Sequence, residues 1–323
     1  MSHHMDLLWQ GLPGPAGFFD ALCGQMEKGS LILCLEDPIP WPETFREELA
    51  QRVPLPLCRL SGAGEGCPGD LILRSFFTPR QRACYFPDES YGTYLSRLDT
   101  EARIVHITGV TEPNQLVRWE ALIEDYRGPL RFLVEYHGSS VSRGVPVLTH
   151  RVNPNELQAY ALLLATKLSN TALVRYQAEL AYRLSGCNPQ LCAELLLLGK
   201  KLLEDPAVCG SDPLLVQSAC QRAAMTAVFP IIEECRFRFI CRHRDVIALH
   251  LPIRNIGGEL IDDPYDLEIG PLHYLVRYQP LLQSLEGSEL IRLCAAMRNR
   301  IAHNKPVQPE TLRVLMDAAA DMK

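Results

Sequence analysis

Residues 298–303 read Arg-Asn-Arg-Ile-Ala-His and combine side chains suited to chemistry on a phosphate. A guanidinium such as that of Arg298 can bind a phosphate through two hydrogen bonds and stabilise developing negative charge. An imidazole such as that of His303 can accept or donate a proton, and Asn299 can position either group. RNA carries its own nucleophile, the 2′-hydroxyl that DNA lacks. The motif therefore predicts metal-independent RNA cleavage, with Arg298 and His303 catalytic and Asn299 supporting.

The motif is expected to lie on a helix over residues 288–303. An apolar stripe supports this helix, and its members recur at helical spacing: Leu290, Cys294, Met297 and Ile301. Arg298 lies at the edge of the stripe, whereas His303 falls about 140° from Arg298 around a regular helix. Two arrangements would reconcile these positions. Either the helix ends or bends near Ala302, or the working site is composite across two subunits.

The segment 298–303 resembles the Arg–x4–6–His signature of HEPN domains, with the frequent Asn after Arg and Ala before His. Residues 304–307 look like the turn into a closing helix, and residues 266–270 look like the stretch that precedes the motif in HEPN domains of defence proteins. The resemblance covers residues 155–323. It implies a helical bundle that forms a homodimer with facing motifs and cleaves RNA as a toxin-like effector in anti-phage defence. A regulatory protein or ATPase partner would restrain it.

Many HEPN domains are non-catalytic, so a second interpretation stays open: an adaptor or assembly module that partners a defence ATPase. In that case Arg298 would pair with Glu289 or with an acidic residue of the preceding loop. His303 would cap the C-terminus of its helix, where the helix dipole favours a cation.

Residues 236–244 read Arg-Phe-Arg-Phe-Ile-Cys-Arg-His-Arg, and basic residues interleaved with aromatic ones can bind RNA. Arg238 and Arg242 would share one helical face. Together with Arg300 and Lys305 beside the motif, they are the candidate RNA-binding residues. The alternative is an amphipathic helix with a solvated basic face.

Near the N-terminus, Gly11, Gly14 and Gly17 precede a predicted helix and look like the remains of a phosphate-binding loop. A working loop needs a Lys for the phosphates and a Ser or Thr for magnesium, and both are missing here. The segment resembles at most an inactive P-loop or STAND-type NTPase, with a nucleotide sensor as a further interpretation. A Gly/Pro turn that caps a helix would explain the same residues. No cofactor and no metal are expected.

Two domains are expected, over residues 1–150 and 151–323. The first alternates strands predicted at 31–36, 55–60, 70–76, 104–110 and 130–136 with helices predicted at 16–27, 43–52, 91–98 and 113–126. Continuous apolar strands are typical of parallel sheets covered by helices on both faces. An α/β domain with a mainly parallel, degenerate P-loop NTPase-like sheet is therefore expected, with a regulatory or partner-binding role and without NTP hydrolysis.

The second domain is expected to be an all-α HEPN-like helix bundle. Its predicted helices cover residues 155–168, 170–185, 189–204, 213–250, 288–303 and 309–322, with Asn170 as an N-cap and a kink or break at Pro230. The segment 252–271 is rich in Gly, Pro and acidic residues and is expected to be an exposed loop.

Composition limits the class of protein. The chain has 323 residues, a net charge of −6 and 12 scattered cysteines without a CxxC pair, so structural thiols are expected. The first 150 residues carry 13 basic and 19 acidic side chains, and the rest carries 19 of each, so a phosphate backbone would approach the second half. The chain lacks a membrane-length apolar run and a leader-like N-terminus, which favours a cytoplasmic protein without membrane contact.

Overall fold

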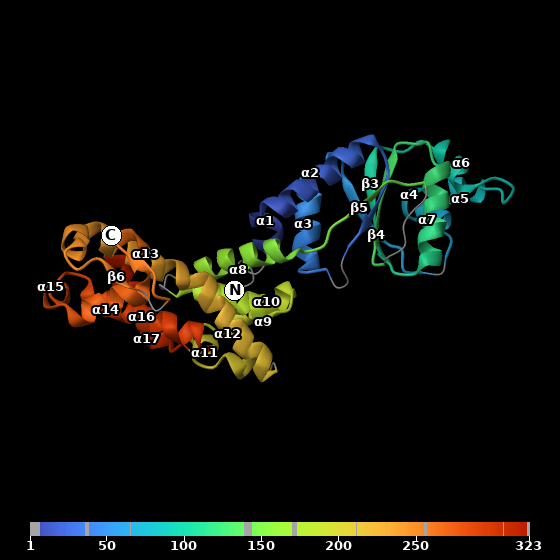
Figure 1. Ribbon diagram of the computed structural model, residues 1–323. Helices are drawn as coiled ribbons and strands as arrows, with labels where there is room; N and C mark the ends of the chain where they lie inside the picture. Colours follow the sequence, from blue (N-terminus) through green and yellow to red (C-terminus); the bar gives the residue numbers. More distant parts are fainter. Residues whose placement is uncertain are drawn as a thin grey trace. The chain divides into compact units, whose positions relative to one another are not determined.

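The computed structural model describes residues 7–35, 39–64, 66–138, 144–169, 173–210, 212–254, 257–305 and 307–321 (Figure 1). Contacts within the chain divide it into two compact units, Met1–Glu156 and Leu157–Lys323. The division falls shortly after the expected boundary at residue 150. The first unit contains a sheet with helices, and the second is built mainly of helices.

In the first unit, the described residues form a five-stranded sheet in which every neighbouring pair of strands is parallel. Its strands, in spatial order, are β2 (Leu57–Ser61), β3 (Arg103–Val110), β4 (Leu130–Tyr136), β1 (Leu31–Cys34) and β5 (Val147–Thr149). The expected parallel α/β sheet is confirmed, and four of the predicted strands are present. The edge strand β5 was not predicted, because three residues carry too little pattern.

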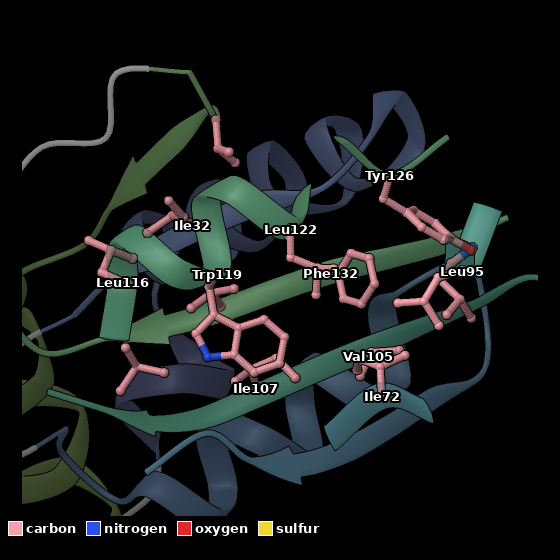
Figure 2. Close-up of a cluster of buried hydrophobic side chains, with 14 of the residues drawn as sticks. Ile32, Ile72, Leu95, Val105, Ile107, Leu116, Trp119, Leu122, Tyr126 and Phe132 are labelled. Carbon is pink, nitrogen blue, oxygen red and sulfur yellow. The ribbon is translucent and has the colours of Figure 1, made fainter. Parts of the chain in front are cut away.

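Helices cover both faces of this sheet. On one face, α7 (Pro113–Asp125) packs with α4 (Pro68–Phe76), α5 (Pro79–Ala83) and α6 (Tyr91–Ser96). Figure 2 shows Leu116, Trp119 and Leu122 of α7 beside Ile107 and Phe132 of the sheet. These side chains are almost fully buried, and the burial of such apolar surface is the main stabilising contribution to the layer.

On the opposite face lie α1 (Leu7–Gly11), α2 (Pro13–Lys28) and α3 (Pro42–Arg52), as Figure 1 shows. Three aromatic rings connect them: Phe45 of α3 lies 5.6 Å from Phe19 of α2 and 4.9 Å from Trp9 of α1, measured between ring centroids. Alternate residues of the strands complete this second core, which explains why the strands read as continuous apolar runs.

The strand predicted at 70–76 is wrong, since these residues belong to α4. Pro68 occupies the first turn of the helix, where its missing N–H is not needed. Ile72, Leu73 and Phe76 then recur at helical spacing and face the sheet, with Ile72 and Leu73 buried. The apolar run is so short that it fits both the helical spacing and the alternation of a strand. Packing against the sheet stabilises the helix.

The second unit contains the helices α9 to α17, a small hairpin and most of α8, whose first turn precedes the division at Glu156. Its elements are α8 (Pro154–Leu168), α9 (Val174–Leu184), α10 (Pro189–Leu197), α11 (Lys200–Glu204), η2 (Pro206–Cys209), α12 (Pro213–Ala227), α13 (Phe229–Ala248), β6 (Ile253–Arg254), β7 (Leu260–Ile261), η3 (Pro264–Asp266), α14 (Ile269–Tyr278), α15 (Pro280–Gln283), α16 (Ser288–Ala302) and α17 (Pro309–Asp321). Asn170, the predicted N-cap, lies outside the described residues. No helix in the described part of the chain combines the length and apolar character needed to cross a membrane.

Two segments of this unit refine the sequence expectations. The predicted break near Pro230 is confirmed, because α12 ends at Ala227 and Pro230 lies in the first turn of α13. The segment 252–271 is not a plain loop. It contains the antiparallel pair β6 and β7, and α14 begins at Ile269 with Pro271 in its first turn.

Candidate active site in the helical unit

The helix α16 is held in the unit by its apolar stripe. All members of the stripe are buried: Leu290, Cys294, Met297 and Ile301. The thiol of Cys294 meets the thiol of Cys235 on α13, and α13 and α14 both pack against α16. Arg298 follows Met297 directly and is half-buried at the edge of the stripe, as its sequence position predicts.

The end of α16 has a defined geometry. The backbone N–H of Asn304 donates to the carbonyl of Ile301 at 3.1 Å, and that of Lys305 donates to the carbonyl of Arg300 at 2.9 Å. This pair of hydrogen bonds is a Schellman motif, with Asn304 in the left-handed conformation at φ +53°. The helix therefore ends at Ala302 and His303 is its C-cap. One of the two arrangements expected from the helical wheel, a helix end near Ala302, is confirmed.

The three predicted catalytic residues are accessible to solvent. Arg298 is half-buried, and Asn299 and His303 are exposed. Within the described part of the chain, none of these side chains forms a hydrogen bond or an ion pair. The alternative pairing of Arg298 with Glu289 is wrong, because Glu289 binds Arg292 at 2.7 Å in the first turn of the helix.

The predicted RNA-binding residues differ among themselves. Arg238 pairs with Glu234 at 2.5 Å and Arg242 pairs with Glu286 at 3.0 Å, so both guanidinium groups already have a carboxylate partner. Arg300 is half-buried, whereas Lys305 is exposed. A paired arginine must give up its carboxylate before it binds a phosphate, so the geometry favours Lys305 over Arg238 and Arg242 as a phosphate contact.

Several side chains of the basic and aromatic segment 236–244 contact residues 265–267, which precede α14. Arg236 donates to the carbonyl of Leu267 at 2.9 Å and to that of Tyr265 at 3.4 Å. The guanidinium of Arg244 lies 5.4 Å from the centre of the Tyr265 ring, a cation–π contact. The interleaving of basic and aromatic residues therefore has a structural explanation in this segment.

The glycines of the predicted phosphate-binding loop lie in helices. Gly11 is the last residue of α1, and Gly14 and Gly17 lie in the first turns of α2. The expected loop would follow a strand, whereas β1 comes after these helices. The glycine at position 14 has another explanation: a Cβ atom there would lie 2.2 Å from Oε1 of Glu156. This segment is a pair of packed helices rather than a loop.

Another glycine-rich segment, missed in the sequence, does follow a strand. Gly62, Gly64 and Gly66 come between β2 and α4 beside a pocket of about 160 Å³. Gly62 has no room for a side chain, because a Cβ atom would lie 2.5 Å from Ile107. However, Asp70 places a carboxylate in the first turn of α4, where it pairs with Arg74. A carboxylate at this position disfavours an anion, so the segment lacks the charge of a phosphate site.

A buried polar cluster joins α3 to the sheet and was also missed. The carboxylate of Glu135 on β4 is hydrogen-bonded to His106 on β3 at 2.9 Å, to His137 at 3.1 Å and to Arg46 on α3 at 3.1 Å. Burial alone would raise the pKa of Glu135, but its three partners outweigh this effect and hold that pKa well below its usual range. Glu135 and His106 have no exposed side-chain surface. The cluster is thus closed to a large substrate.

No known family model and no characterised protein matches the sequence. The HEPN resemblance therefore rests on residues 298–303 and on their helical setting. Among the described residues, no cluster of His, Cys, Asp and Glu has the arrangement of a metal site, and the cysteines described there are free thiols.

Proposed function

We propose that the helical unit is a HEPN-type endoribonuclease whose catalytic residues are Arg298 and His303, supported by Asn299. One observation carries the proposal: these side chains lie at the accessible end of α16 without partners in the described part of the chain. The neighbouring arginines of α13 and α16 behave differently, because Arg238, Arg242 and Arg292 all pair with carboxylates. A cation and an imidazole left unpaired together are available to a substrate.

The proposed reaction needs no group beyond the substrate and the protein. The 2′-oxygen of the RNA attacks the adjacent phosphorus, the bond from phosphorus to the 5′-oxygen breaks, and the products carry a 2′,3′-cyclic phosphate and a 5′-hydroxyl. The proton of the 2′-hydroxyl leaves during the attack, and the 5′-oxygen gains a proton as it departs. His303 accepts the first proton or donates the second, and Arg298 binds the phosphate oxygens as charge develops on them.

Arg298 and His303 are about 140° apart around a regular helix, which favours a homodimer in which Arg298 of one copy and His303 of the other form one site. The exposed position of His303 at the helix end is compatible with such a seam. We expect mixing of Arg298→Ala and His303→Ala proteins to restore cleavage, because each mixed dimer would then contain one site with both residues intact. Statistical mixing predicts about a quarter of the wild-type rate. Unrestored activity after verified subunit exchange would place both residues of each site in one chain.

The wider role follows from the same resemblance. We propose a toxin-like effector in anti-phage defence, acting in the cytoplasm, with the α/β unit as a non-hydrolysing regulatory or partner-binding domain. A regulatory protein or an ATPase would be its partner. The helical position of Gly11, Gly14 and Gly17 gives no support to a nucleotide sensor at that segment.

The proposal is tested by incubating purified protein with total RNA and with tRNA in the presence of a chelator. We expect the wild-type protein to fragment RNA and His303→Ala to lose the activity. Arg313→Ala is the control, because Arg313 is an exposed residue of α17 outside the motif. Equal cleavage by wild-type and His303→Ala proteins would refute the proposed role of His303.

A non-catalytic adaptor is the second candidate, and one observation favours it. Tyr274 and Tyr278 lie one turn apart on α14 with ring centroids 4.8 Å apart, and both are more than half exposed, at 58% and 55%. Leu281 of α15 is 59% exposed. Exposed aromatic and aliphatic side chains close together in sequence are typical of a protein interface. Toxicity and RNA cleavage that do not depend on His303 would support this candidate.

A further inference from the structure

The helical unit contains a pocket beside the turn that follows α16. Its volume is about 430 Å³. One face of α12, the residues around η2, and the Schellman turn with Asn304 and Lys305 form its walls. Ile301, one helical turn after Arg298, also lines it. The pocket therefore adjoins the proposed catalytic motif.

The inner wall of the pocket is largely apolar. It includes the side chains of Ala224 and Ile301, which are buried, and that of Tyr176. Burial raises the pKa of Tyr176, so its hydroxyl stays protonated, and it is hydrogen-bonded to the Cys220 thiol. An apolar wall suits the flat face of a nucleobase, as in proteins that bind splayed bases of single-stranded RNA.

Carboxamide groups provide the polar part of the lining. Gln217 and Gln221 are four residues apart on α12 and share one face, and Asn304 faces the pocket from the turn. Within the described residues, none of these three side chains forms a hydrogen bond. A carboxamide presents a donor and an acceptor side by side, so it can pair with a base edge that does the same, such as N6 and N7 of adenine or N3 and O4 of uracil.

The charges around the pocket permit an RNA strand to enter. Lys305 provides a positive charge at the turn, where an adjoining phosphate would lie. The two carboxylates of the lining already have partners: Glu204 pairs with Lys200 at 2.9 Å, and Asp205 accepts a hydrogen bond from the backbone of Ala207 at 3.2 Å. The volume also lies within the range of small-ligand sites, roughly 300–1,000 Å³.

We infer that this pocket binds a nucleobase of the RNA next to the phosphate on which Arg298 and His303 act. The inference rests on the proposed function and specifies its substrate recognition. Gln217 and Gln221 are then base-binding residues. Two glutamines on α12 gave no signal in the sequence, because their relevance depends on the turn after α16 lying beside them.

The test measures equilibrium binding of fluorescent single-stranded oligoadenylate, and of an abasic oligomer of the same length, to full-length His303→Ala protein, in which cleavage does not consume the probe. We expect oligoadenylate to bind about tenfold more tightly than the abasic oligomer. Gln217→Ala with Gln221→Ala should abolish this preference by weakening oligoadenylate binding about tenfold. Alanine favours a helix, so α12 should remain folded. Gln283→Ala is the matched control, since Gln283 is an exposed glutamine outside the pocket.

Equal affinity for the two oligomers, the absence of binding to either, or a preference that persists in the double variant would each overturn the inference. Failure of the proposed nuclease function gives a different result, namely RNA cleavage that is unchanged in His303→Ala. The binding assay contains no cleavage step, so the two failures are distinguishable.

Discussion

The two units of this protein differ in whether the charged side chains of their polar clusters are buried and paired or accessible and unpaired. In the α/β unit, Glu135 is fully buried between α3 and the sheet, and three side chains donate hydrogen bonds to it. In the helical unit, Arg298 and His303 lie at the accessible end of α16, and no described residue pairs with either side chain. Both regions combine a cation and an imidazole, so residue types alone do not separate a structural cluster from a candidate site.

Partners and access make the difference. A buried carboxylate without partners would be prohibitively unstable, so the donors around Glu135 are required by the fold. An exposed arginine and histidine remain solvated without partners and can exchange water for a ligand. The buried cluster is not complete, since Nδ1 of His106 and Nε of Arg46 are buried without a hydrogen bond among the described residues. The carboxylate of Glu135 nevertheless has three hydrogen-bond donors and is fully buried, so a substrate cannot reach it.

The largest expected effect comes from removing the centre of the buried cluster. Glu135→Ala leaves Arg46, His106 and His137 without their shared carboxylate, so we expect a loss of about 3–5 kcal/mol in the free energy of unfolding of the α/β unit. Urea unfolding followed by tryptophan fluorescence measures it, because Trp9, Trp41 and Trp119 all lie in this unit.

Glu43→Ala is the matched control for this variant. Glu43 also binds Arg46, at 2.9 Å, but its side chain is exposed, so only a small change is expected. Similar unfolding curves for the Glu135 and Glu43 variants would remove the distinction between the buried cluster and the surface.

The next effect concerns the helical unit. Arg298→Lys keeps the charge but loses the paired N–H groups that we propose bind the phosphate, so we expect the cleavage rate to fall about a hundredfold to a thousandfold. Arg238→Lys serves as the comparison, because Arg238 is held by Glu234, and its cleavage rate should stay within about twofold. Comparable losses in both variants would indicate that general basicity, rather than the motif, sustains RNA cleavage.

A smaller effect is expected from the pH dependence of stability at His150. This ring packs against Trp9 and Phe18 at 5.3 and 4.7 Å, and its burial lowers the pKa of His150 despite Glu156 nearby. As the pH falls below 6.5, the ordinary pKa of a histidine, His150 becomes protonated in the unfolded chain before it does in the folded one. The free energy of unfolding therefore decreases. His150→Phe should flatten the stability profile of the α/β unit between pH 7 and about pH 5. A profile equally steep in the variant would assign the dependence to other groups.

The sequence allows the local features of the candidate site to be predicted. The stripe that ends at Ile301, the position of Arg298 beside it and the helix end near Ala302 all follow from helical periodicity, and the structure has each of them. The parallel sheet follows from apolar runs such as that of β1. The prediction of a strand at 70–76 is wrong because a short apolar run fits both helical spacing and strand alternation. Packing against the sheet stabilises the helix α4 instead.

Features that depend on residues far apart in the sequence could not be predicted. His106 and Glu135 meet only because β3 and β4 are neighbours in the sheet, and Arg46 meets them only because α3 covers that face. In the same way, the carboxylate partner of Arg242 is Glu286, more than forty residues away along the chain. No pattern within a single segment contains this information.

We propose that His303 enables attack by the 2′-hydroxyl of RNA. The most direct measurement is mass spectrometry of the RNA ends produced by wild-type and His303→Ala proteins. We expect 2′,3′-cyclic phosphate and 5′-hydroxyl ends with the wild type and none above background with the variant. Fragments with 5′-phosphate ends, or the same cyclic-phosphate yield from both proteins, would contradict it.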